Sequence, residues 1–159
     1  MSFMRQVSRQ LDDEHRNSID LLDRVSNALS SGDASALDKL ASPLVRQLEH
    51  EIGHHFGFEE GELFPRMMQA GDGELASLLA EEHGTIRMVA ADLLPLAEQL
   101  AAGTLAAGDR PALVRLTKEL VERQVAHIQK ETMALLPLLE DMLDDETDRE
   151  LSLIYAEGA

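Results

Sequence analysis

Apolar residues recur three or four positions apart in four long stretches of this chain, and this helical spacing constrains its fold most. The stretches cover about residues 8–29, 33–68, 74–102 and 109–143. Glycines beside serine or aspartate separate them, and such pairs end one helix and begin the next. Helices this long bury their apolar stripes only by packing side by side. The sequence therefore predicts an all-α fold, an antiparallel up-down four-helix bundle.

One domain accounts for nearly the whole chain of 159 residues. Residues 1–145 are predicted to form the bundle, and residues 146–159 an acidic C-terminal tail or a short C-terminal helix. Asp33 is a predicted N-cap. Pro43 is predicted to kink the second helix or to mark a short helix before it. Asp109 followed by Pro111 predicts the start of the fourth helix.

The charge balance excludes several classes of partner. The chain has 14 Lys and Arg against 30 Asp and Glu, a formal net charge of −16. Such a chain repels phosphate backbones and anionic headgroups, so neither nucleic acid nor a membrane is expected as a partner. Cysteine is absent, which leaves histidine and carboxylate as metal ligands. No apolar signal segment or membrane span is recognisable, and we expect a cytoplasmic protein.

Two motifs occur twice, about 70 residues apart. The first is His-x3-Glu with a proline six residues after the glutamate, and it comprises His55, Glu59 and Pro65 and then His127, Glu131 and Pro137. The second is an acidic residue before a histidine, in Glu14-His15 and Glu82-His83. The two helix pairs therefore read as two copies of one unit.

These motifs place polar groups on the apolar stripes. Residues four apart on a helix point the same way, so each His-x3-Glu pair faces the core. Buried carboxylates without partners would cost several kcal/mol each, and no inward lysine is available. A metal site explains the set, which comprises His15, His55, Glu59, His83, His127 and Glu131.

Counting donors favours two ions. If both glutamates bridge, each ion receives two imidazoles and two carboxylate oxygens. A bridging oxo or hydroxo group would bring each ion to five ligands and leave one position open, which is typical of reactive rather than structural metals. Oxygen and imidazole ligands without sulfur suit iron (Fe2+/Fe3+) first, with manganese or zinc as alternatives.

The same motifs resemble the hemerythrin-like, or HHE cation-binding, domain family over about residues 11–143. The resemblance implies a four-helix bundle with a non-haem di-iron centre that meets dioxygen, nitric oxide or peroxide, and it assigns the six residues above as ligands. Oxygen-carrying hemerythrins usually have a second histidine one turn after His83, where this chain has Arg87. That difference argues against reversible oxygen carriage. Arg87 either pairs with a ligand carboxylate or an anion, or is an ordinary surface residue.

Other residues near the motifs admit two interpretations. Glu62 shares the inward face of Glu59 and is either an additional ligand or a solvated side chain. His50 and His54 are predicted at the surface, with adventitious metal binding as the alternative. Glu51-x-x-His54 matches the unit of ferritin-like bundles, but the fourth helix has Gln124 in the equivalent place, so that match is weaker.

The second helix carries an unusual glycine stripe. Gly53, Gly57 and Gly61 recur every four residues, and each would cost about 1 kcal/mol relative to alanine. Phe56 and Phe64 are predicted to project away from the metal stripe. Together with His50, this face predicts a homodimer contact or an intrachain docking surface.

The leading hypothesis is thus a di-iron protein that binds a small oxidant, namely dioxygen, peroxide or nitric oxide. Enzymatic turnover of peroxide or nitric oxide at the centre is one form of this hypothesis. The alternative is a non-enzymatic iron store or an iron/redox sensor, in which metal occupancy stabilises the bundle and a partner reads that state. An acidic helical scaffold without metal leaves the inward glutamates unexplained.

Overall fold

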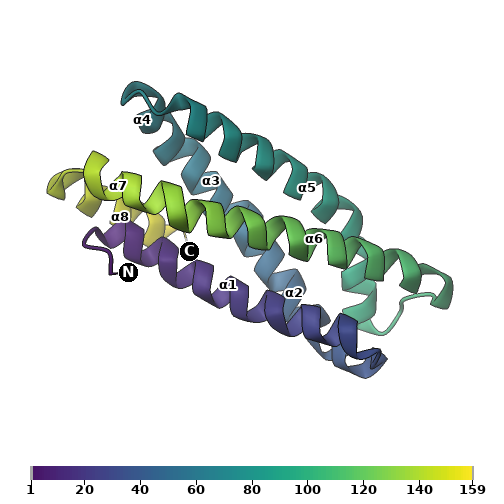
Figure 1. Cartoon of the computed structure of the whole chain (residues 1–159). Coiled ribbons are helices and arrows are strands. Elements are labelled where there is room, and N and C mark those ends of the chain that lie inside the picture. The colour runs from purple at the N-terminus through teal and green to yellow at the C-terminus, as the bar shows by residue number, and fades with distance from the viewer. Residues whose placement is uncertain (1, 159) are drawn as a thin grey trace.

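The computed structural model describes residues 2–158, and within them all regular structure is helical. Four long rods begin with α1 (Gln6–Ser31), α2 (Ala34–His50), α5 (Gly73–Ala102) and α6 (Arg110–Lys130). Figure 1 shows them running side by side, and each packs against the next in the cyclic order α1, α2, α5, α6. Short turns reverse the chain between successive rods. The predicted antiparallel four-helix bundle is confirmed.

The second and fourth rods continue through wider π-helical turns. The second proceeds through η1 (Glu51–His55), α3 (Phe56–Phe58), η2 (Glu59–Leu63) and α4 (Phe64–Gln69), and the fourth through η4 (Glu131–Leu135) and α7 (Leu136–Met142). Pro65 and Pro137 follow η2 and η4 closely, and proline has no N–H for the ordinary bond to the carbonyl four residues back. The preceding residues Phe64 and Leu136 bond to Glu59 and Glu131, five residues back. The same kind of bond joins Phe56 to Glu51 in η1, where glycine follows in place of proline.

Some of the predicted helix ends are confirmed and others are not. Asp33 does cap α2, because its carboxylate accepts a hydrogen bond from the Ser35 N–H at 3.0 Å. Pro43 lies inside α2, so it does not separate a short helix from a longer one. Asp109 makes no side-chain cap; a 3-10 turn, η3 (Ala107–Asp109), leads into α6 instead, with Pro111 in the first turn.

The C-terminal segment forms α8 (Asp145–Glu157), which packs against α1 near both chain ends (Figure 1). Asp148 accepts hydrogen bonds from the backbone N–H groups of Gln6 and Val7 at 2.9 and 3.0 Å, and so satisfies the otherwise unpaired start of α1. Leu151 and Tyr155 of α8 are buried. Of the two expectations for this segment, the structure shows the helix.

The interior contains two apolar clusters with a polar layer between them. One cluster includes Leu22, Leu48 and Leu93, and the other includes Leu11, Leu79 and Leu139. Between them along each rod lies a buried His or His/Glu pair. The apolar layers exclude water from both sides of that polar layer, which raises the energetic cost of leaving it unpaired.

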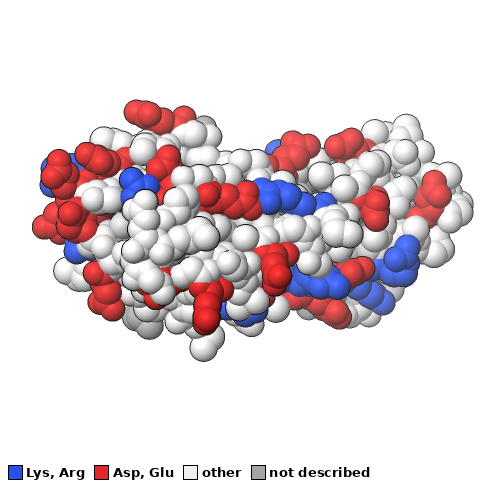
Figure 2. Space-filling view, turned by 90° about the horizontal axis from the view of Figure 1, so that it is seen from above, with Lys and Arg blue, Asp and Glu red and all other residues white. Residues whose placement is uncertain are grey.

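Acidic side chains are scattered over the face shown in Figure 2 and gather at the end where Figure 1 places α7 and α8. Among the described residues, no helix is long and apolar enough to cross a membrane.

Candidate metal centre

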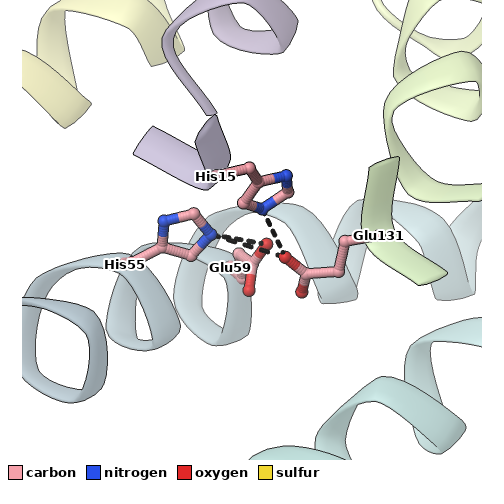
Figure 3. Close-up of side chains that lie close together, drawn as sticks. All are labelled: His15, His55, Glu59 and Glu131. Carbon is pink, nitrogen blue, oxygen red and sulfur yellow. Dashed lines mark hydrogen bonds and ion pairs between the residues drawn. The ribbon is translucent and has the colours of Figure 1, made fainter. Parts of the chain in front are cut away.

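The polar layer brings together all six side chains that the sequence singled out. They form two groups of four within which the candidate ligand atoms lie no more than 4.8 Å apart: His15, His55, Glu59 and Glu131, and Glu59, His83, His127 and Glu131. Every one of these residues is buried. Figure 3 shows the first group, with both imidazoles directed at the two carboxylates. We call the His15/His55 group position 1 and the His83/His127 group position 2.

The two glutamates belong to both positions. Glu131 Oε1 lies 3.0 Å from His15 Nε2 and 3.4 Å from His55 Nε2, while its Oε2 lies 3.0 Å from His127 Nε2 and 3.5 Å from His83 Nε2. Glu59 reaches His55 at 3.2 Å with Oε2 and His83 at 3.1 Å with Oε1. Each carboxylate thus turns one oxygen toward each position. This is the arrangement that a carboxylate bridging two ions requires.

Many of these atoms lack a hydrogen bond. The Nε2 atoms of His55, His83 and His127, both oxygens of Glu59 and one oxygen of Glu131 are buried with no hydrogen-bond partner among the described residues. Buried polar atoms are normally paired, and a cluster of orphans that converge on one point is costly without a bound group. Their chemistry, imidazole nitrogen and carboxylate oxygen, matches first-row transition metals. These residues therefore fit a metal site.

The outward-facing Nδ1 atoms of the four histidines all take part in hydrogen bonds. His55 bonds to Glu14 at 2.9 Å, His83 to Glu60 at 2.8 Å, His127 to Glu82 at 2.8 Å and His15 to Thr132 at 2.9 Å. Each partner sits beside a candidate ligand on a neighbouring rod, so the four bonds close a ring around the bundle. Such bonds orient the ring and direct its Nε2 inward, as in known metal sites.

The acidic residue before each repeated histidine therefore serves a different histidine. Glu14 precedes His15 but holds His55, and Glu82 precedes His83 but holds His127. The sequence did not predict Glu60 or Thr132 as partners. Their position immediately after Glu59 and Glu131 was the available signal, because adjacent residues on a helix face neighbouring rods.

Electrostatics follow the same geometry. Burial lowers the pKa of His83, but the carboxylates of Glu131 and Glu59, 3.5 and 3.1 Å from its Nε2, overcome this and raise that pKa to about 10. Burial also lowers the pKa of His127, and the carboxylate of Glu131, 3.0 Å from its Nε2, more than compensates, so that this pKa too is raised. For Glu131, burial raises the pKa, yet the surrounding imidazoles hold it well below its usual range. Without a metal, protons on these imidazoles compensate the buried carboxylates.

Two cations neutralise the outer partners at position 2. Arg87 pairs with Glu60 at 2.6 and 2.9 Å and lies 5.4 Å above the Phe56 ring. Lys130 pairs with Glu82. Arg87 thus contacts a carboxylate that orients a candidate ligand, so it is more than an ordinary surface residue.

The predicted orientation of two aromatic residues is wrong. Phe56 is fully buried and stacks on His83 with ring centroids 3.7 Å apart, and Phe64 lies 5.4 Å from the same ring. Both rings face α5 rather than pointing away from the site. They wall one side of His83 with apolar surface, which restricts the rotation of that imidazole.

Two further polar side chains are buried without full pairing. Glu51 is 1% exposed, its Oε1 has no hydrogen-bond partner among the described residues, and its Oε2 lies 3.9 Å from His55 Nδ1. Burial raises its pKa. Gln124, three residues before His127, is fully buried and neither of its amide atoms is bonded. The ferritin-like comparison drew attention to these residues, but their burial in the bundle core emerges only from the structure.

The structure separates the remaining candidates from the centre. Glu62 pairs with Arg66 at 3.1 Å, is one-third exposed and joins neither group, which agrees better with the solvated interpretation than with a ligand. His50 is exposed as predicted. His54 is only half-exposed, because its ring packs on Tyr155 at 4.4 Å.

The glycine stripe faces open space. A side-chain carbon added at Gly53, Gly57 or Gly61 would meet no atom within 4 Å. Among the described residues, close packing of another helix is therefore not the reason for these glycines. The stripe lines a surface depression of about 500 Å³ that Ile154 and Gly158 of the C-terminal segment also border.

Comparison with known sequences agrees with this geometry. The hemerythrin HHE cation binding domain model matches residues 6–139. The chain belongs to the hemerythrin HHE cation-binding family. The match spans the four rods and all six residues of the centre. No curated protein sequence matches this chain.

Proposed function

We propose that this hemerythrin-family chain binds two iron ions, one at position 1 and one at position 2. We propose further that this centre binds a small oxidant, namely dioxygen, peroxide or nitric oxide. The observation that carries this proposal is the sharing of Glu59 and Glu131 by both groups of ligands. Two carboxylates that each face two positions would hold one ion at each. An iron pair there would supply two electrons to, or accept them from, a small ligand.

The protein's own residues prepare the centre in three ways. Glu14, Glu60, Glu82 and Thr132 fix each imidazole so that Nε2 faces inward. The two apolar clusters keep bulk water away. Burial raises the pKa of Glu51, whose carboxyl group lies beside His55.

Two surface depressions give small molecules access to the ligands. One of about 800 Å³ lies between α1 and α6 and includes His15 and Thr132 in its lining. The other, of about 550 Å³, lies between α5 and α6 and includes Glu82 and His127. His15 and His127 are almost fully buried at the floors of these depressions. Because little of either side chain is exposed, the site favours small ligands over bulky substrates.

Metal analysis and optical spectroscopy test this proposal. Protein prepared with ferrous iron should hold about two iron atoms per chain, as two four-residue groups require. Its absorption should change on addition of azide, peroxide or nitric oxide. Absence of bound iron together with unchanged thermal stability would contradict the metal centre, and a loaded but inert spectrum would contradict small-ligand binding.

An iron or redox sensor is the second candidate, and one contact favours it. Tyr155 of α8 donates a hydrogen bond to Glu14, which in turn holds His55. The C-terminal helix is thereby joined to a metal ligand through one carboxylate. If metal binding or oxidation changes hydrogen–deuterium exchange in α8 while peroxide turnover is absent, sensing is favoured over catalysis.

The glycine face supports a separate proposal of a homodimer. Its depression is open in one chain, and a second copy would cover it. Sedimentation equilibrium that finds only monomer at high concentration would exclude this contact.

A further inference from the structure

A third cluster of metal-ligating side chains lies outside the buried centre. Glu14 of α1, His50 at the end of α2 and His54 of η1 offer ligand atoms that all lie within 4.8 Å of one another. His50 Nε2 bonds to Glu14 Oε1 at 2.9 Å, and the two imidazoles have centroids 5.0 Å apart. The cluster is accessible, because the His50 side chain is 43% exposed.

The surrounding structure holds these donors in place. His50 and His54 are four residues apart on one rod and therefore project in the same direction. The His54 ring lies between Tyr155 and Gly158, where a side-chain carbon added at Gly158 would approach it within 2.9 Å. His54 Nε2 is buried and has no hydrogen-bond partner among the described residues. An unpaired imidazole nitrogen beside a second imidazole and a carboxylate is a donor set suited to zinc and its neighbours.

We propose that Glu14, His50 and His54 bind one divalent transition-metal ion at the protein surface, in addition to the buried pair. The ion takes two imidazole nitrogens and one carboxylate oxygen, and water fills its remaining positions. It replaces the hydrogen bond between His50 and Glu14 with coordination of both groups. Zn2+ is the probe of choice because it has no redox chemistry.

This outer site is linked to the buried centre through Glu14. One oxygen of Glu14 faces His50, and the other accepts a hydrogen bond from His55 Nδ1 and from the Tyr155 hydroxyl. A cation on the first oxygen draws charge from the carboxylate and weakens its hold on His55, which makes His55 a poorer donor. This coupling, unlike the outer site itself, rests on the proposed function. We expect outer metal to shift the absorption of the iron-loaded centre.

Calorimetric titration of Zn2+ into iron-loaded protein tests the site, with iron content measured before and after. The wild-type chain should bind one additional ion. His50→Gln and His54→Gln should each weaken that binding at least about tenfold, since loss of a mere outer partner of a metal already has an effect of that size. Glu49→Gln, an exposed change on the same rod, should have no effect. His50 is exposed, so its variant keeps the test valid if His54→Gln fails to fold.

The outcomes distinguish this site from the buried one. If only the outer site exists, the metal-free chain binds a single Zn2+ that His50→Gln weakens. If only the buried centre exists, the metal-free chain binds two, and both histidine variants bind them equally well. Absence of an additional ion on iron-loaded protein, or one that neither histidine variant weakens, would overturn the proposal. An outer ion that leaves the iron spectrum unchanged would overturn the coupling.

Discussion

Positions 1 and 2 arise from repeated motifs, yet their surroundings differ. At position 2, the carboxylates that hold His83 and His127 are neutralised by Arg87 and Lys130. At position 1, the hydroxyl of Thr132 holds His15, and Glu14 holds His55 with Tyr155 as its other buried partner. Position 1 also adjoins the buried carboxyl group of Glu51.

The difference teaches that one ligand pattern yields two chemically distinct positions. At position 2, balanced ion pairs fix both histidines and Phe56 packs on one of them. Position 1 has fewer full charges to balance its acidic neighbours and is connected to the C-terminal helix. We therefore expect position 2 to anchor its ion more firmly and position 1 to respond more to ligands and to outer metal.

Removing a shared ligand should cause the loss of iron from both positions. Glu131→Gln takes a charged oxygen from both positions, so iron content should fall from about two atoms to fewer than about 0.5 per chain. Elemental analysis after desalting measures this. Glu62→Gln is the matched control, because Glu62 is a nearby glutamate outside both groups, and it should retain both ions. Loss of iron in the control alone would make Glu62 the ligand.

The stability of the metal-free protein should depend on pH because His83 at position 2 changes its charge. The pKa of His83 is about 10 in the fold against an ordinary value of 6.5. The protonated form therefore stabilises the fold fully below pH 6.5, and this contribution is lost as the pH rises through 10. Chelator-treated protein should lose denaturant stability over that range. His83→Gln should show a flatter profile, and an equally steep one would contradict the assignment.

Changing the orienting partners should separate the two positions. Glu60→Gln and Glu82→Gln should each weaken iron binding at position 2 about 10- to 100-fold, the usual effect of losing an outer carboxylate. Thr132→Val should weaken iron binding at position 1 about tenfold, the lower end of that range, because it removes a neutral hydroxyl group rather than a carboxylate. Competition with a chelator of known affinity measures these changes. Equal effects from all three would show that the charge difference between the positions is unimportant.

Replacing Glu51 should give the smallest change in stability, and a favourable one. Glu51→Leu removes a buried carboxyl group with an unpaired oxygen, whose desolvation costs about 1 to 3 kcal/mol. Metal-free protein should therefore melt a few degrees higher, at roughly 2–4 °C per kcal/mol for a chain of this size. The same variant should respond more weakly to peroxide when iron-loaded. A lower melting temperature would indicate a pairing that the structure does not show.

The fold and the six residues of the centre could be predicted from the sequence because both depend on local spacing. Apolar residues at helical intervals define four rods, and a histidine four residues before a glutamate shares its face whatever the neighbours are. Glu62 shows the limit of such reasoning. The π-turn at Glu59–Leu63 changes the angle between successive side chains, so the ordinary helical count cannot decide between the two interpretations of Glu62.

Contacts between rods could not be predicted in this way. The sequence shows Glu14 next to His15, but only the packing of α1 on the second rod brings Glu14 to His55. The same holds for Phe56, which stacks on a histidine 27 positions further along the chain.

By itself, then, the sequence determined the helices, their apolar faces and the shared inward face of each His-x3-Glu pair, because these are properties of single segments. Only the tertiary structure decided which partner orients each histidine, that Tyr155 reaches the centre's outer carboxylate, and that positions 1 and 2 differ. The physical reason is that hydrogen bonds and ion pairs act over about 3 Å, a distance set by the packing of different rods against one another.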